Sequence, residues 1–204
     1  MTALVWNEKS VYEYGISKGV LYVEDEPGVV WNGLISVEQL SVGGDRTAIH
    51  FEGIKSMDEI TNREFQASIT AFSHPREFNL CLGNVEVLPG FILTRQTRRK
   101  FNLCYRTEIN ERDYKLHLVY NCTVTPGAVT RKTLTDRPEA VQSTWTVNAV
   151  PFLSNTHFPT AHLILDSRRT PSGMLELLEE SLYGSGSLEP TMPDLDTLEY
   201  YLNN

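Results

Sequence analysis

The sequence has little of what marks a secreted, membrane-spanning or redox-active protein. Only three cysteines occur in 204 residues, and they form no CxxC pair of the kind that binds zinc or carries redox chemistry. No charged segment followed by an apolar stretch stands at Met1, and no apolar run approaches the roughly 20 residues of a membrane-spanning helix. We therefore expect a soluble protein without membrane contact, made in a cytoplasm, whose cysteines are small buried hydrophobes.

The motifs of several enzyme classes are also missing. Neither GxxxxGK[ST] nor GxGxxG occurs, so no phosphate-binding loop is predicted, and the nucleophile motif GxSxG is absent. The five histidines show no HxxxH or HxH spacing, which two imidazoles on one metal would need. The acidic triplet 24–26 lacks the spacing of a calcium loop and is interpreted as a solvated turn. No catalytic residue, metal or cofactor is predicted, and we expect that the protein is not an enzyme.

Basic residues are scarce outside one short block. The formal net charge is −8, yet residues 91–115 hold seven of the 18 Lys and Arg residues, and no basic residue follows Arg169. Such segregation favours pairing between unlike patches, within a chain or between copies. A protein that binds duplex DNA would show a basic excess across the domain. The sequence pI of about 5.1 argues against that function.

The basic block reads "RQTRRKFNLCYRTE" over residues 95–108, with five cations and one carboxylate. Aromatic residues between cations are typical of platforms that stack single-stranded nucleic acid. On an alternating strand, however, Phe101, Leu103 and Tyr105 share one face, and we expect that face to lie in the core while the cations face outward. We interpret the block as a basic loop and strand edge that pairs with an acidic surface.

Short strands separated by turn signals dominate the rest of the chain. The clearest is 115–124, in which Leu116, Leu118, Tyr120, Cys122 and Val124 are expected on one face. Further strands are predicted at 19–23, 29–42, 47–54, 65–72, 142–150 and 161–165, and a hairpin arm or long loop at 125–138.

Two helices are predicted. The first begins near Thr170-Pro171, carries leucines at helical spacing and ends at Gly184, and a short one covers 194–202. The linker "GSGSLEPTMP" between them is expected to be flexible. The fold class predicted is mainly β (α+β), a β-sandwich or barrel with one packed helix. Residues 1–184 are predicted as a single β-rich domain and 185–204 as an acidic C-terminal extension.

Several stretches, in their order along the chain, resemble one protein family. They are Gly28-Val-Val-Trp-Asn-Gly-Leu34, Phe101-Asn-Leu-Cys-Tyr-Arg-Thr107, Tyr114-Lys-Leu-His-Leu-Val-Tyr120, Asp136-Arg-Pro-Glu-Ala140, and Leu165-Asp-Ser167 followed by the leucine helix ending Leu182-Tyr-Gly184. Over residues 10–184 the chain resembles the major tail (tail tube) proteins of siphovirus-type bacteriophages.

That resemblance implies a structural virion protein. Its subunits would form hexameric rings that stack into a hollow tail tube, with tape-measure protein and transiting DNA in the lumen. The other implied partners are copies of the chain itself and the tail terminator and tail-tip proteins. Location in the phage tail, assembly in the host bacterial cytoplasm and the absence of enzymatic activity are implied as well.

Charge segregation and the resemblance together suggest a subunit interface. We hypothesise that cations of the basic block join subunits or rings through acidic residues of a neighbour, and that reversing Arg98 and Arg99 to glutamate blocks assembly. The predicted interface residues are Arg95, Arg98, Arg99, Lys100, Arg106, Arg131, Lys132, Glu189, Asp194, Asp196 and Glu199.

Three alternatives stay open at this point. A minor tail or tail-end ring or adaptor protein of the same phage tail could share the pattern. A nucleic-acid-binding module would use the basic block, and its binding would weaken with salt. A carbohydrate- or receptor-binding tail component ranks last, because no paired carboxylates or aromatic platform support it.

Overall fold

The structure is a computed structural model and describes residues 12–44, 46–60, 63–109, 111–128, 130, 133, 140–152, 159–194, 196–198 and 200. The elements follow one another as β1 (Tyr14–Val23), β2 (Val29–Val30), β3 (Leu34–Gly43), β4 (Arg46–Phe51), β5 (Ile54–Ile60), β6 (Arg63–Ala71), α1 (Phe78–Leu82), β7 (Val85–Leu88), β8 (Phe91–Leu93), β9 (Phe101–Glu108), β10 (Tyr114–Pro126), β11 (Ser143–Ala149), β12 (His162–Asp166) and α2 (Ser172–Tyr183).

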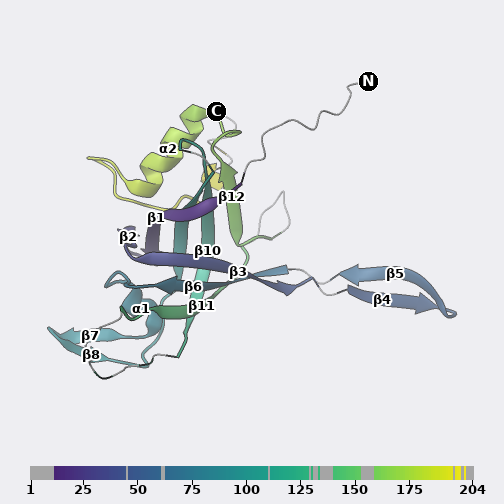
Figure 1. Cartoon of the computed structure of the whole chain (residues 1–204), viewed down its shortest axis with the longest axis horizontal. Coiled ribbons are helices and arrows are strands. Elements are labelled where there is room, and N and C mark those ends of the chain that lie inside the picture. The colour runs from purple at the N-terminus through teal and green to yellow at the C-terminus, as the bar shows by residue number, and fades with distance from the viewer. Residues whose placement is uncertain are drawn as a thin grey trace.

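One antiparallel sheet organises the body of the molecule (Figure 1). Seven of its eight strands run in the order β2-β1-β9-β10-β11-β6-β3. The eighth strand, β12, pairs with the part of β10 that β11 leaves free. The sheet curls on itself. This is shown by Gln39 of the edge strand β3, whose Nε2 lies 3.3 Å from Nδ1 of His162 on β12. This arrangement confirms the mainly β fold predicted from the sequence.

The larger hydrophobic core is held by one face of the sheet and by α1. Phe78 of α1 is fully buried, and its ring lies 4.6 Å from Trp31, 5.3 Å from Trp145 and 5.6 Å from Phe101 between centroids. Trp31 Nε1 also donates a hydrogen bond to the Ser73 carbonyl at 2.9 Å. Aromatic side chains from four segments therefore meet at one point and fix α1 against the sheet.

The opposite face of the sheet packs under α2. Leu178 and Leu182 of α2 are fully buried against Leu116 and Leu118 of β10, as the helical spacing predicted. Tyr22 of β1 belongs to the same cluster, and its hydroxyl donates to the Leu182 carbonyl at 2.7 Å. None of the described helices has the length and apolar character needed to cross a bilayer.

Strand β10 changes faces at a β-bulge. Its pairing with β9 slips between Val119 and Cys122, and Asn121 has a positive φ of 51°, which asparagine tolerates better than most residues. Leu116, Leu118 and Tyr120 consequently pack under α2, whereas Cys122 and Val124 lie in the core against α1. The prediction that these five side chains share one face is wrong, because one extra residue reverses the alternation that follows it.

Several element boundaries also differ from the prediction. The strand expected at 47–54 is two strands, since Glu52 and Gly53 both have positive φ and form the tight turn between β4 and β5. The short helix α1 was not predicted. The helix α2 begins at Ser172, one residue later than the expected cap would place it, and ends at Gly184 as predicted. Most of the loop expected at 125–138 lies outside the described residues.

The stretch after α2 lies against its own chain instead of extending freely. The Thr191 amide donates to the Ser181 carbonyl and the Gly28 amide to the Pro190 carbonyl, both at 2.8 Å. Residues 196–198 are helical, and Leu198 is buried in the cluster under α2. The linker, which was expected to be flexible, is therefore fixed by hydrogen bonds to its own chain. The division of the chain at residue 184 stays a prediction.

Two separate β-ribbons extend from this body (Figure 1). The first, β4–β5, continues outward from the neighbouring strands β3 and β6. The second, β7–β8, follows α1 and is closed at Pro89-Gly90, where the Glu86 carboxylate accepts a hydrogen bond from the Gly90 amide at 2.8 Å. Isolated two-stranded ribbons are marginally stable in water, so both depend on their attachment or on further contacts.

We expect the aromatic contacts of Phe78 to stabilise the fold strongly. Phe78→Ala should lower the free energy of unfolding by about 3–5 kcal/mol, because it empties a fully buried aromatic site. Phe91→Ala in β8 is the matched control, since that ring is 67% exposed, and should change it by less than about 0.5 kcal/mol. Urea unfolding followed by far-UV circular dichroism checks both; equal losses would contradict this account of the core.

Candidate assembly surfaces

The basic loop, residues 94–100, connects β8 to β9 and is fixed against α1. The Gln96 amide donates to the Gly83 carbonyl at 2.8 Å, and the Arg99 amide to the Leu80 carbonyl at 3.2 Å. Gly83 has a positive φ of 76°, and a Cβ there would lie 2.6 Å from the Gln96 carbonyl oxygen, so only glycine allows this approach. The backbone therefore presents the loop's cations on a fixed exposed surface.

The four cations of this loop differ in their partners. Arg98 Nη1 donates to the Val124 carbonyl at 3.1 Å, and Arg99 forms an exposed ion pair with Glu26 at 3.3 Å. Arg95 and Lys100 are exposed and have no acidic partner in the part of the chain that the structure describes. Exposed pairs contribute about 0–1 kcal/mol, so this side of the loop keeps its positive charge available.

Arg106, by contrast, does not face outward. The residue is only 7% exposed, its Nη2 lies 2.5 Å from Glu179 Oε1, and its Nε donates to the Tyr183 hydroxyl at 3.1 Å. The guanidinium also stacks on Tyr114, 3.8 Å from the ring centroid. The expectation that Arg106 is a surface cation is wrong, because α2 brings a carboxylate and an aromatic ring to it from a distant part of the chain.

The face prediction for the aromatics of β9 is confirmed. Phe101, Leu103 and Tyr105 all lie in the core against α1, so these rings are not displayed for stacking on nucleic-acid bases. The predicted basic loop and the buried aromatic face thus separate, and only the loop remains a candidate surface.

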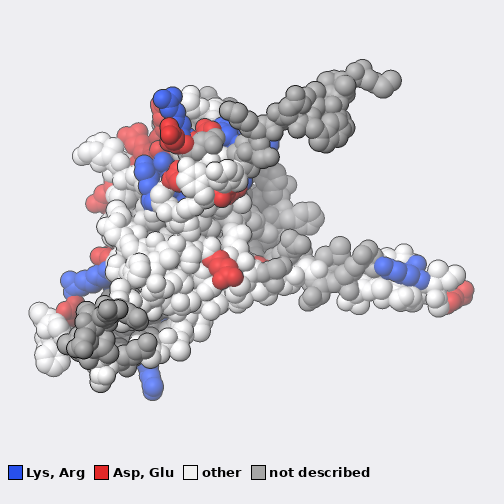
Figure 2. All heavy atoms as spheres, viewed as in Figure 1, with Lys and Arg blue, Asp and Glu red and all other residues white. Residues whose placement is uncertain are grey.

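Several exposed acidic side chains lie on α2 and in the stretch after it, and Figure 2 shows acidic charge at this end of the molecule as well as elsewhere. Glu176 and Glu180 are exposed on the helix, and Glu189, Asp194 and Asp196 are exposed beyond it. Asp194 also accepts a hydrogen bond from the Thr197 amide at 2.8 Å, and hydrogen bonds from the side chain and then the backbone of Thr197 lower the pKa of its carboxyl group. No ion pair joins the basic loop to these residues within the described ranges, and Arg131, Lys132 and Glu199 lie outside those ranges.

The two ribbons are the surfaces that sequence reasoning missed. Phe51 and Ile54, on either side of the β4–β5 turn, are 62% and 74% exposed. On β7–β8 the exposed side chains include Val87, Leu88 and Phe91. Contiguous exposed apolar side chains mark interaction sites. The turn signals at Glu52-Gly53 and Pro89-Gly90 could have located both ribbons.

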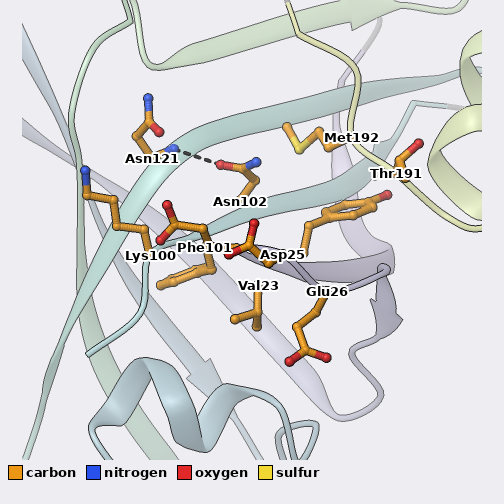
Figure 3. A pocket seen from close by; sticks show the side chains of 11 residues that line it. Val23, Asp25, Glu26, Lys100, Phe101, Asn102, Asn121, Thr191 and Met192 are labelled. Atoms are coloured by element: carbon orange, nitrogen blue, oxygen red, sulfur yellow. Dashed lines mark hydrogen bonds between the residues drawn. The ribbon is translucent and has the colours of Figure 1, made fainter. Parts of the chain in front are cut away.

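A polar hollow of about 260 Å³ opens beside the basic loop (Figure 3). Asn102 of β9 and Asn121 of β10 line one part of it, where the Asn121 amide donates to Asn102 Oδ1 at 2.8 Å. Asp25 and Glu26 line another part. No group of three or more His, Cys, Asp or Glu side chains suited to a metal occurs among the described residues.

The cysteines are unreactive in this structure. All three are buried free thiols, as predicted, and burial raises the pKa of Cys81 and of Cys104 to about 12. Since the thiolate is the reactive form, neither thiol is activated as a nucleophile.

A histidine pair lies where β10 and β12 meet, with His117 buried and His162 partly buried. His117 Nδ1 and His162 Nε2 are 3.1 Å apart, and His117 stacks on Tyr105 with ring centroids 4.6 Å apart and planes inclined by 3°. Burial lowers the pKa of both imidazoles to about 4, with His117 adding to the effect on His162. The pair is therefore neutral at pH 7, and one ring donates its N–H to the other.

No protein-family model matches this chain, and no curated protein matches it. Among solved structures, the chain is similar to the sheath/tube terminator of PVC, an extracellular contractile injection system, in the extended state. The identity is 13%, the TM-score 0.41, and the match covers 76% of this chain and 97% of that one.

Two further structures show comparable similarity. A chain of the PVC sheath–tube complex in the extended state has 13% identity and a TM-score of 0.41, over 73% of this chain and 88% of that chain. The tube-terminating cap of the anti-feeding prophage has 10% identity and a TM-score of 0.43, over 78% and 97% respectively.

We expect Glu179 to stabilise the fold by neutralising Arg106. Glu179→Ala should lower the free energy of unfolding by about 3 kcal/mol, because it leaves a buried guanidinium without its carboxylate. Glu180→Ala, at an exposed position of the same helix, is the matched control and should change it by less than about 0.5 kcal/mol. The double variant Arg106→Met/Glu179→Leu should lose less unfolding free energy than Glu179→Ala alone. A larger loss in the double variant, measured by chemical denaturation, would contradict the pairing of Arg106 with Glu179.

The histidine pair predicts a loss of stability in mild acid. The imidazoles have pKa values of about 4 when folded and about 6.5 when unfolded, so the unfolded chain binds more protons between these values. The stability they contribute is therefore complete above pH 6.5 and is lost as the pH falls toward 4, by several kcal/mol for the two imidazoles together.

Urea midpoints measured between pH 4 and 7 check this histidine effect. The variant His117→Gln/His162→Gln should show a flatter dependence over that interval. Asp166 serves as an internal reference, because Arg168 lowers the pKa of its carboxyl to about 2, and its own contribution is therefore lost in more acidic solution. If the urea midpoint of the double variant fell with pH as steeply as that of the wild type, the histidine pair would not be the source of the acid sensitivity.

Proposed function

We propose that this chain is a structural subunit of a bacteriophage tail, namely the major tail subunit of a siphovirus-type phage. Copies join in hexameric rings, and the rings stack into a hollow tube that holds the tape-measure protein and lets DNA pass into the host. Terminator and tail-tip proteins bind the two ends of the tube. The subunit is made in the cytoplasm of the host bacterium, acts in the virion and catalyses no reaction.

The observation that carries the proposal is the pair of β-ribbons at opposite ends of the molecule (Figure 1). Each displays large hydrophobic side chains that an isolated chain leaves in solvent. Contacts between two unlike surfaces of one chain are heterologous, and they generate closed rings or open filaments. A chain with such surfaces at both ends is therefore better suited to repeated assembly than to a monomeric state. The ordered sequence motifs shared with tail tube proteins support the same function.

Charge segregation supports assembly between copies as well. The basic loop leaves Arg95 and Lys100 exposed, with Arg98 and Arg99 beside them, while the charged residues exposed on α2 and after it are acidic: Glu176, Glu180, Glu189, Asp194 and Asp196. Unlike charges on facing patches steer association and fix its register. Arg106 is left out of this interface because its charge is neutralised inside the chain.

Electron microscopy of the purified full chain tests the function. Tubes are expected, with a six-fold repeat in end-on views. Closed rings that never stack would favour a tail-end ring or adaptor protein instead. Persistent monomers at high concentration would contradict an assembly role altogether. Salt-sensitive binding of DNA by such monomers would favour a nucleic-acid-binding module.

We expect the exposed cations of the basic loop to be needed for assembly. Arg95→Glu/Lys100→Glu should reduce tube formation at least about tenfold, because like charges then meet across the interface. This pair replaces the reversal of Arg98 and Arg99, since Arg98 binds the Val124 carbonyl of its own chain. Circular dichroism should show an unchanged fold.

The control for this reversal carries the same change of charge elsewhere. Arg112→Glu/Arg169→Glu alters two exposed cations near the other end of β9, away from the basic loop, and should assemble normally. Sedimentation followed by microscopy measures both variants. Normal tubes from Arg95→Glu/Lys100→Glu would show that the loop takes no part in the interface.

A further inference from the structure

The turn between β2 and β3 holds the only Asn-Gly pair of the sequence, Asn32-Gly33. Both residues are exposed. Among the asparagines that the structure describes, Asn32 alone is exposed, and the others are partly buried. The proposed function gives this turn no role, and the chemistry of the turn is independent of that function.

The fold requires a glycine at position 33. Gly33 has a positive φ of 91°, a conformation that glycine adopts without strain. A Cβ at this position would lie 2.4 Å from Ser73 Oγ and 3.1 Å from the Ser73 amide nitrogen. The Gly33 carbonyl also accepts a hydrogen bond from the Phe72 amide at 2.9 Å. A side chain at position 33 would therefore strain the turn and push it away from residues 72–73.

An asparagine followed by a glycine is chemically labile, because glycine has no Cβ to hinder its main-chain nitrogen. Hydroxide removes the proton of the Gly33 amide, and the nitrogen attacks Cγ of the Asn32 side chain. The new N–Cγ bond closes a five-membered succinimide, the Cγ–Nδ2 bond breaks, and Nδ2 takes a proton from water and leaves as ammonia. Water then opens the ring at one of its two carbonyl carbons. The products are aspartate and isoaspartate, and no oxidant or reductant is needed.

The structure leaves the Asn32 side chain free to react. Within the described part of the chain its amide group makes no hydrogen bond, and Ser73 Oγ donates instead to the main-chain carbonyl of Asn32 at 2.9 Å. Rotation of the side chain therefore breaks no hydrogen bond as Cγ approaches the Gly33 nitrogen. We propose that Asn32 is a site of spontaneous deamidation, at which the turn changes to aspartate and isoaspartate as the protein ages.

Isoaspartate at position 32 disturbs the anchor of a buried tryptophan. In this product the main chain runs through the former side chain, so it gains one carbon, and the carbonyl that binds Ser73 Oγ becomes part of a free carboxylate. The Gly33 carbonyl binds the Phe72 amide, and the Ser73 carbonyl accepts from Trp31 Nε1 at 2.9 Å. A longer main chain cannot keep all of these bonds in place. Aspartate leaves the path of the main chain unchanged and should keep them.

Ageing of the purified full chain tests the site. The protein is kept in mildly alkaline buffer and digested, mass spectrometry measures the fraction of acid at each asparagine, and enzymatic methylation measures isoaspartate. Asn32 should react at least about tenfold faster than Asn84, which is followed by valine, because glycine leaves the attacking nitrogen unhindered. A smaller ratio would overturn the proposal.

A synthetic peptide of residues 29–35 separates the sequence motif from the fold. The peptide contains the same Asn-Gly pair without the rest of the chain. The folded chain should react within about tenfold of the peptide, since a residue fixed in an unreactive conformation would be slowed by about that factor or more. If the folded chain reacts more slowly than this, the turn holds Cγ away from the Gly33 nitrogen and the proposal falls.

Asn32→Gln is the variant that blocks the reaction, because glutamine has to close a less favourable six-membered ring. It should form no isoaspartate at position 32, and it should fold normally because the Asn32 side chain is exposed. Asn84→Gln is the matched control and should age like the wild type. Isoaspartate that persists at the wild-type level in Asn32→Gln protein would place the reaction elsewhere in the chain.

Urea unfolding checks the effect of the modification on the fold. Aged wild-type protein should have a lower urea midpoint than fresh protein, while aged Asn32→Gln should keep its midpoint. Fresh Asn32→Asp has the added charge with an unchanged main chain and should unfold like fresh wild type. If aged wild type that contains isoaspartate kept its midpoint, the anchor of Trp31 would not depend on this turn, and that part of the inference would be overturned.

Discussion

Burial of β10 on both faces is the constraint on which the rest of the structure depends. Leu116 and Leu118 pack under α2, while Val119, Cys122 and Val124 pack in the core against α1. The same strand pairs with β9 along one edge and with β12 and β11 in succession along the other. Because the bulge at Asn121 sets which side chains reach which core, the two helices and both hydrophobic clusters are positioned by one strand.

Sequence patterns succeeded where one face of an element meets solvent. Trp145, Val147 and Ala149 alternate with polar residues on β11, and the leucines of α2 recur at helical spacing, so both were placed correctly. The face change of β10 was missed because it depends on a β-bulge in the pairing with β9, which slips between Val119 and Cys122. A contact between two strands leaves no periodic signal in either one.

The candidate surfaces were predicted only in part, for related reasons. The position of the basic loop follows from its sequence, but the burial of Arg106 depends on Glu179, 73 residues further along the chain. The ribbons escaped notice because Phe51 and Ile54 contradict the usual rule that apolar residues lie inside. That rule describes an isolated chain. A subunit with partners exposes part of its hydrophobic surface for contact with them. A single sequence does not distinguish apolar residues that fill the core from apolar residues that contact a partner.

The continuity of β4–β5 with the sheet has a mechanical consequence. The ribbon grows out of β3 and β6, and β6 is hydrogen-bonded to β11 in register from Phe65 to Ala71. Hydrogen bonds of an antiparallel pair run perpendicular to the strands, so a pull on the ribbon loads all of those between β6 and β11 in shear at once. Strands loaded this way resist far better than strands peeled apart one bond at a time. Tension applied at the ribbon therefore passes directly into the central sheet.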